Sequence, residues 1–122
     1  MKKLVLMLCL IGFGYAANGQ TATELLGKWQ LVKWVDKGKE KDIQKTYKTD
    51  QVYQVFQEDS KFQSIIGDKV KDGKWSLNKD NSKLTIKSGL ISVKFKIEYF
   101  DEEKRVISSS LVGTLEYKKV EN

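Results

Sequence analysis

Hydrophobic and polar residues alternate in short runs along most of this chain. The clearest run, Ile91–Tyr99, has an apolar or aromatic residue at every odd-numbered position and a polar residue between each pair. Alternation with a period of two is the pattern of a β-strand that buries one face. We therefore expect the five odd-numbered side chains of this run to face the interior of a sheet.

Eight such strands are expected, separated by clusters of Gly, Asn, Asp and Ser that favour turns. In chain order they are Lys28–Val35, Gln51–Gln57, Lys61–Ile66, Gly73–Leu77, Lys83–Ser88, Ile91–Tyr99, Arg105–Leu111 and Thr114–Val120. One-sided alternation favours an antiparallel sheet, and closure of that sheet removes its exposed edges. The expected fold class is therefore all-β, an eight-stranded antiparallel up-and-down barrel.

The first strand does not alternate regularly. Trp29 and Leu31 share one face, whereas Val32 and Trp34 fall on the other. An extra residue in one strand of a pair shifts the alternation in this way. We therefore expect a β-bulge or a bend near Lys33.

The phase of the strand Arg105–Leu111 is less clear, because apolar residues occur on both of its faces. We expect Ile107, Ser109 and Leu111 to face inward, although Val106 leaves the opposite phase open.

The longest connection, Asp36–Asp50, holds five lysines, four acidic residues and two bulky apolar anchors, Ile43 and Tyr47. We expect a mobile loop with room for a short helical turn. Upstream of the strands, Thr21–Leu26 is expected to form one helical turn, which Gly27 ends.

The first nineteen residues have the layout of a secretory signal peptide. A charged start (Lys2 and Lys3) precedes an apolar run (Leu4–Phe13), and small and polar residues follow. The apolar run is about half the length needed to span a bilayer. We expect cleavage before Gln20, or one residue later.

The mature protein is then one domain, residues 20–122, in the periplasm or outside the cell. The chain has one cysteine, Cys9, and it lies in the predicted signal peptide. The domain therefore needs no disulfide, even in an oxidising compartment. After removal of the signal we expect no stable insertion into a membrane.

Charge and composition narrow the function. The net charge is +6, and removal of Lys2 and Lys3 leaves +4, with both signs interspersed. No basic run with interleaved aromatic residues occurs, so we expect no nucleic-acid partner. The chain has no His, and loss of Cys9 also removes the thiol nucleophile and most zinc ligands. We therefore expect no enzyme, no catalytic residue, no metal site and no cofactor.

The motif Gly27-Lys28-Trp29 is the first sign of a resemblance to a known family. A short helical turn, a Gly-x-Trp motif that opens the first strand, and then strands in meander order resemble the lipocalin-like domains of small exported bacterial proteins. The resemblance spans nearly all of Glu24–Glu121. It implies a lipocalin-like barrel and an arginine packed on the indole of Trp29. The chain has one arginine, Arg105, and the meander places it at the same end of the barrel as this indole.

That end is expected to be closed by Leu25, Leu26 and Trp29. In a meander the connections alternate between the two ends of the barrel, so the Asp36–Asp50 loop belongs to the opposite end. There it could act as a lid over a mouth.

The candidate ligand-binding residues are the inward apolar and aromatic side chains. They are Phe56, Phe62, Trp75, Ile86, Val93, Phe95, Ile97, Tyr99 and Tyr117. If they face inward, Gln54, Ser64 and Ser109 would orient the polar end of a ligand.

Two functions remain open, because eight-stranded barrels lie at the boundary between a filled core and one small-ligand cavity. The first is an exported, non-enzymatic binding protein that holds a small apolar or amphipathic molecule. The second is a protein–protein interaction module, such as an inhibitor or an accessory of an envelope complex, with a filled barrel.

Overall fold

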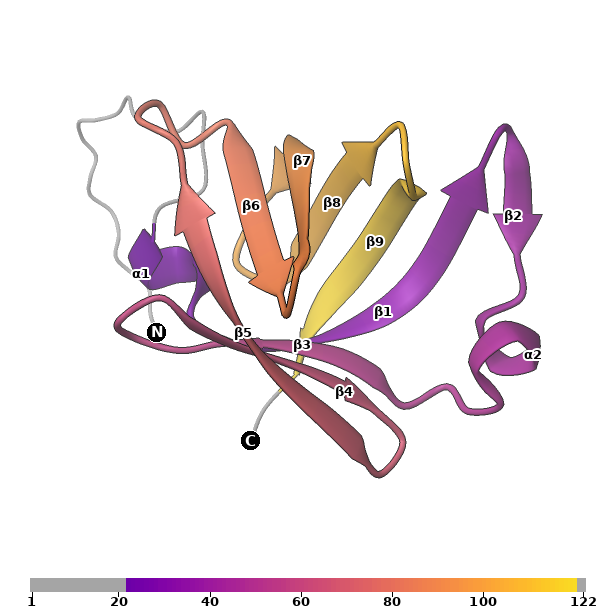
Figure 1. Ribbon diagram of the computed structural model, residues 1–122. Helices are drawn as coiled ribbons and strands as arrows, with labels where there is room; N and C mark the ends of the chain where they lie inside the picture. The colour runs from indigo at the N-terminus through magenta and orange to yellow at the C-terminus, as the bar shows by residue number, and fades with distance from the viewer. Residues whose placement is uncertain (1–21, 121–122) are drawn as a thin grey trace.

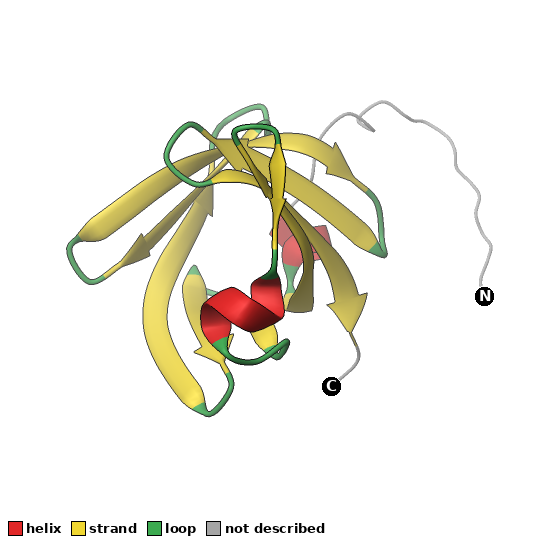
Figure 2. Cartoon of the chain, turned by 90° about the vertical axis from the view of Figure 1, so that its right-hand side faces the viewer, coloured by secondary structure: helices red, strands yellow, loops and turns green. Residues whose placement is uncertain are grey.

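The computed structural model describes residues 22–120, which form an antiparallel sheet rolled into a closed barrel (Figures 1 and 2). The elements are α1 (Ala22–Leu25), β1 (Gly27–Asp36), β2 (Lys39–Lys41), α2 (Ile43–Tyr47), β3 (Val52–Phe56), β4 (Lys61–Ile66), β5 (Lys69–Leu77), β6 (Lys83–Ser88), β7 (Ile91–Phe100), β8 (Lys104–Ser109) and β9 (Gly113–Val120). Strands β1 and β3 to β9 pair in meander order, and β9 returns to β1. The expected eight-stranded barrel is confirmed. The predicted signal peptide and its cleavage site lie outside the described residues.

Strand β1 closes the barrel and carries the expected bulge. It pairs with β3 through Gly27–Gln30 and with β9 along most of its length, and the β9 register shifts between Leu31 and Lys33. After the bulge, Trp34 packs against the core and its Nε1 donates a 2.9 Å hydrogen bond to the carbonyl of Val112. The bulge therefore returns Trp34 to the interior.

The Asp36–Asp50 connection contains more structure than the sequence predicts. A turn with positive φ at Lys37 and Gly38 leads into β2, which pairs with the end of β1. The expected helical turn is present as α2, whose first turn is capped by Asp42, and the anchors Ile43 and Tyr47 pack against the core. Strand β2 was not predicted, because its sequence Lys-Glu-Lys has no apolar alternation.

Two strand boundaries differ from the prediction by more than one residue. Strand β5 begins at Lys69, four residues before Gly73, because Gly67 adopts a φ of 63° and makes a tight turn. Strand β8 ends at Ser109, whose Oγ accepts a hydrogen bond from the Val112 N–H in the following turn. Leu111 lies in this turn and is 74% exposed, so the prediction that it faces inward is wrong.

Strand β7 contains a second irregularity, and it corrects one candidate site residue. The register with β8 shifts between Ile97 and Tyr99, so that Phe100 lies opposite the buried Arg105. Tyr99 then lies opposite Val106, on the outer face, and is 49% exposed. The prediction that Tyr99 faces the interior is wrong, because the shift exchanges the two faces at the end of the strand.

The two ends of the barrel differ, as the meander predicts. Helix α1, the start of β1 and the β3–β4, β5–β6 and β7–β8 turns lie at the closed end. The β4–β5, β6–β7 and β8–β9 turns lie at the opposite end, which we call the mouth. In Figure 2, which looks into the barrel, α2 crosses the opening.

Candidate functional site: the barrel interior and its mouth

Trp29 is the centre of the closed end. It is completely buried, and its Nε1 donates a 2.9 Å hydrogen bond to the carbonyl of Leu25 in α1. The guanidinium of Arg105 lies 5.0 Å from the indole and the ammonium of Lys119 lies 4.7 Å from it. The expected packing of Arg105 on Trp29 is therefore confirmed, and a second cation joins it.

Arg105 lies entirely inside the barrel. Its guanidinium is also 4.9 Å from the ring of Phe56 and 4.4 Å from that of Tyr117. Nη2 donates a 2.7 Å hydrogen bond to Oε1 of Gln54, whereas Nε and Nη1 have no acceptor among the described residues. Contact with the faces of three aromatic rings offsets part of the cost of burying this charge.

Burial shifts two pKa values here in opposite directions. It lowers the pKa of Arg105 to about 10, so the guanidinium remains protonated at neutral pH. Burial raises the pKa of the Tyr117 phenol, which therefore stays neutral in the folded protein.

The closed half of the interior is packed with aromatic side chains. Phe56 lies 5.1 Å from Phe62 and 5.7 Å from Trp75, both edge to face. The Nε1 of Trp75 donates a 3.0 Å hydrogen bond to the carbonyl of Gln57. These three candidate residues are brought together, and they fill this part of the barrel.

The other candidate residues line the wall of the barrel, with Val93 toward the mouth and Ile97 and Tyr117 toward the closed end. Ile86, Phe95 and Tyr117 are buried, and Val93 and Ile97 are partly buried against the core. The polar residues are placed less uniformly. Gln54 accepts a hydrogen bond from Arg105, and Ser64 lies opposite Gln54 in the β3–β4 pairing. Ser109 accepts a hydrogen bond from Val112 in the β8–β9 turn.

Aromatic residues that sequence reasoning did not assign to the site lie at the mouth. Trp34 and Tyr47 pack with their ring centroids 6.0 Å apart, and both are partly buried. Partial burial raises the pKa of Tyr47. The bulge before Trp34 was the available signal, because it moves the following residues to the opposite face.

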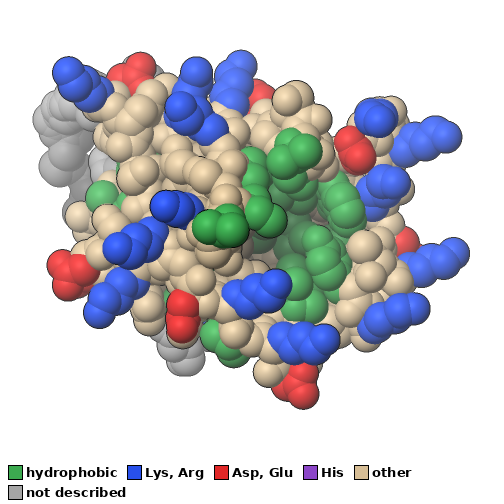
Figure 3. Space-filling view, viewed as in Figure 1, with side chains coloured by type: hydrophobic (Ala, Val, Ile, Leu, Met, Phe, Trp, Pro, Cys, Tyr) green, Lys and Arg blue, Asp and Glu red, His purple; other side chains and the backbone are tan. Residues whose placement is uncertain are grey.

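The mouth opens into an apolar hollow. Figure 3 shows hydrophobic side chains gathered in a hollow, with lysines around its edge. Large apolar side chains are exposed at the surrounding turns and partly buried just inside them. They are Leu90, Ile91 and Leu111 at the turns, and Trp34, Tyr47, Ile66, Val93 and Val112 inside.

The wall of the barrel is incomplete beside the mouth. Strand β7 pairs with β8 only from Lys96 onward, so its first half has no partner on that side. A surface cleft of about 410 Å³ lies where the strands part, and its lining includes the interior residue Phe95. This gap is a second place where the interior approaches solvent.

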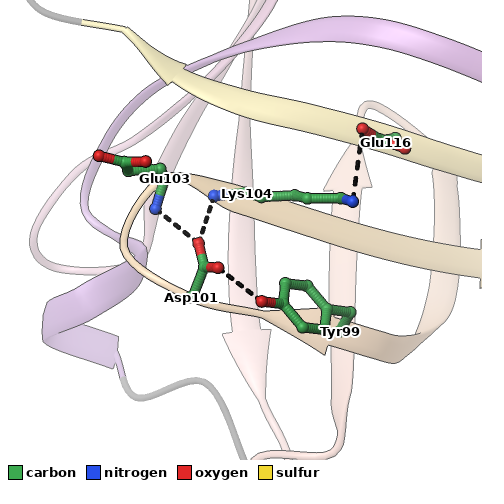
Figure 4. Close-up of polar contacts among 5 residues, drawn as sticks. All are labelled: Tyr99, Asp101, Glu103, Lys104 and Glu116. Atoms are coloured by element: carbon green, nitrogen blue, oxygen red, sulfur yellow. Dashed lines mark hydrogen bonds and ion pairs between the residues drawn. The ribbon is translucent and has the colours of Figure 1, made fainter.

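The β7–β8 turn, at the closed end, shows why Tyr99 points outward (Figure 4). The Tyr99 hydroxyl donates a 2.6 Å hydrogen bond to Asp101, whose other carboxylate oxygen accepts the backbone N–H groups of Glu103 and Lys104 at 2.8 Å. The Tyr99 hydrogen bond, followed by that from Glu103, lowers the pKa of Asp101. This carboxylate therefore organises an exposed turn and does not face the interior.

Within residues 22–120, no three side chains of the metal-binding types converge on a common point. None of the helices in this part of the chain is long and apolar enough to cross a membrane.

A closed antiparallel barrel with one packed end and one apolar mouth defines the class of protein, a small β-barrel of the binding-protein type. A family model described as a lipocalin-like domain matches residues 25–107. The chain belongs to this lipocalin-like family. The match ends inside β8, although β9 is needed to close the barrel.

Solved structures agree on the fold. The chain is similar to a lipocalin-like protein from Bacteroides uniformis, with a TM-score of 0.65 and 20% identity over 80% of this chain and 99% of that one. It is also similar to an uncharacterized protein from Bacteroides eggerthii, with a TM-score of 0.63 and 16% identity over 79% of this chain and 99% of the other. A search of curated protein sequences found no match.

Proposed function

We propose that this protein is an exported, non-enzymatic binding protein that takes a small apolar or amphipathic molecule through the mouth into the barrel. The observation that carries the proposal is the apolar hollow at the mouth, which is continuous with a wall of buried apolar side chains. Monomeric proteins rarely leave apolar side chains gathered at an opening unless something binds there. The predicted signal peptide supports export.

The packing of the interior supports an elongated ligand held in the mouth half of the barrel. The closed half is occupied by Arg105 and the rings of Phe56, Phe62 and Trp75. The mouth half is lined by smaller side chains such as Val93 and by the half-buried Tyr47. Ser64 and Gln54, midway down the wall, are polar partners for one end of the ligand.

The proposal is tested by titrating fatty acids, sterols and environment-sensitive dyes against residues 20–122. Every strand pairing lies within residues 27–120, so this chain contains the whole barrel. We expect saturable binding of at least one compound. Phe95→Ala should change the order of affinities among the compounds, whereas Lys94→Ala, on the adjacent outward position, should not.

The rates of binding give a second readout. Tyr47→Ala in α2 should change the rates of uptake and release with little effect on folding. No saturable binding by the wild-type chain would reject the proposal. The filled barrel with a protein partner would then be the better description, and Phe95→Ala would act only as a core deletion.

A further inference from the structure

The β6–β7 hairpin has an unusual distribution of side chains. Its turn places Leu90 (103% exposed) and Ile91 (67% exposed) at the mouth with no covering residue among those described. The expectation that Ile91 faces the interior is therefore wrong, because this first residue of β7 lies at the rim. From residue 83 to residue 97 the hairpin carries four lysines and no acidic residue. It therefore combines an apolar tip with arms whose charged residues are all basic up to Ile97, and Glu98 follows in β7.

The lysines of this hairpin share the outer face of the sheet. Lys83 pairs directly with Lys96 across β6 and β7, and Lys74 on β5 pairs directly with Lys87. Like charges opposite each other on adjacent strands are destabilising. Glu98 lies 4.0 Å from Lys96 and accepts a hydrogen bond from Ser108.

A cleft on the same face is suited to an anionic group. The cleft between β7 and β8 is bordered by Lys83, Lys94 and Lys96 and by the hydroxyl residues Ser108 and Thr114. Its volume of about 410 Å³ exceeds that of a phosphate group. Ammonium and hydroxyl groups are common donors to phosphate oxygens.

We propose that the β6–β7 hairpin docks the mouth of the barrel onto a membrane surface that contains anionic phospholipids. Leu90 and Ile91 enter the interface between headgroups and acyl chains, and the lysines contact phosphate oxygens. An apolar element flanked by basic residues is the arrangement that binds such surfaces, and the anionic surface relieves the repulsion between the paired lysines. The phosphates of a nucleic acid would also neutralise the lysines, but they would make no favourable contact with the exposed side chains of Leu90 and Ile91.

Docking in this orientation would bring the mouth to a source of apolar molecules. The docking proposal depends only on surface residues, and it is tested without any barrel ligand. If the protein does not bind vesicles, the proposed ligand binding is therefore unaffected. If it binds no barrel ligand, the docking proposal is likewise unaffected.

The test is flotation of residues 20–122 with vesicles of phosphatidylcholine alone or of an equimolar mixture with phosphatidylglycerol. We expect binding to the anionic vesicles only, weakened by salt. The double variants Leu90→Ser/Ile91→Ser and Lys87→Gln/Lys94→Gln should each reduce binding about tenfold or more. The matched controls are Val32→Ser, an exposed apolar residue of β1 outside the hairpin, and Lys79→Gln, in the β5–β6 turn at the closed end.

Three results would overturn the proposal. They are absence of wild-type binding to anionic vesicles, equal binding of the Leu90→Ser/Ile91→Ser variant, and equal loss in the controls. A wild-type chain that ignores vesicles but retains a single-stranded oligonucleotide would point to a nucleic acid instead. Circular dichroism of each variant verifies that these surface changes leave the fold intact.

Discussion

Arg105 shows at the scale of one residue how a small barrel accommodates a buried charge. Its guanidinium is enclosed by three rings and, among residues 22–120, makes one hydrogen bond, to Gln54. Cation–π contacts reach about 2 kcal/mol each when they are desolvated, whereas burying an ion costs several kcal/mol. Because these contacts and the cost of burial largely offset each other, the volume that Arg105 fills contributes to stability at least as much as its charge.

Two substitutions separate charge from volume. Arg105→Ala should lower the free energy of unfolding by about 2–5 kcal/mol, because it opens a cavity beside Trp29 and leaves Gln54 without its donor. Arg105→Met should cost less than about half as much, since it keeps most of the volume and removes the desolvated charge. Urea denaturation of both variants tests this, and a larger loss for Met than for Ala would contradict it.

Trp29 should be the most sensitive single position at the closed end. Trp29→Ala should lower the free energy of unfolding by about 3–5 kcal/mol, the range for loss of a buried large aromatic side chain. Lys74→Ala, on the exposed face of β5, should change it by less than about 0.5 kcal/mol. Equal effects in chemical denaturation would mean that Trp29 does not close the barrel.

At the scale of the element, strand β5 depends on a glycine. A Cβ at Gly73 would lie 2.4 Å from the carbonyl oxygen of Lys87 and 3.3 Å from the ring of Phe62. The backbone of β6 can therefore approach β5 closely only because this side chain is missing.

Gly73→Ala tests that close approach. It should lower the free energy of unfolding by about 1–3 kcal/mol, because the backbone atoms it meets cannot move aside without disturbing the β5–β6 pairing. Ser76→Ala, at an exposed position of the same strand, is the matched control. A melting temperature unchanged by Gly73→Ala would show that the strands can separate freely there.

Helix α2 is the other element whose local chemistry has a consequence for function. The side chain of Asp42 accepts a 3.0 Å hydrogen bond from the backbone N–H of Lys45, and Lys48 ends the helix in the left-handed conformation. A helix this short depends on its caps. Its stability therefore determines how firmly the mouth is covered.

Asp42→Ala should remove about 1 kcal/mol of local helix stability and leave the barrel folded. Amide hydrogen exchange should become faster in α2 only, and release of a bound dye should become faster in stopped flow. Lys45→Ala keeps the backbone donor and serves as the control. Unchanged exchange in α2 would show that Ile43 and Tyr47 hold the helix without its cap.

At the scale of the whole molecule, removal of the predicted signal peptide can be tested directly. We expect the exported protein to lack residues 1–19, because small residues precede Gln20 where a signal peptidase would cleave. Intact mass of the protein from the envelope fraction or the medium decides this. A species that retains Met1–Gly19 would contradict the signal peptide.

The chain shows which properties local sequence can determine. The strand order, the turn positions and the all-β class could be predicted, because two-residue alternation and turn residues act over a few neighbours. The place of Arg105 near Trp29 could also be predicted, since a meander assigns each turn to one end of the barrel. Eight of the nine candidate residues are buried or pack against the core, as alternation predicts. One of the eight, Ile97, lies just before the irregularity in β7 that turns Tyr99 outward.

Only the tertiary structure decided the exceptions, and each lies where a distant contact overrides the local pattern. Tyr99 faces solvent because the β7 register shift turns Phe100 inward, where its ring centroid lies 6.0 Å from that of Trp29. Trp29 belongs to β1, more than sixty residues earlier in the chain. Trp34 turns inward because a bulge lets it reach Val112, and β2 exists because it pairs with the end of β1. Alternation is a property of neighbours in sequence, but a bulge is stabilised by the side chains that it brings together across the barrel.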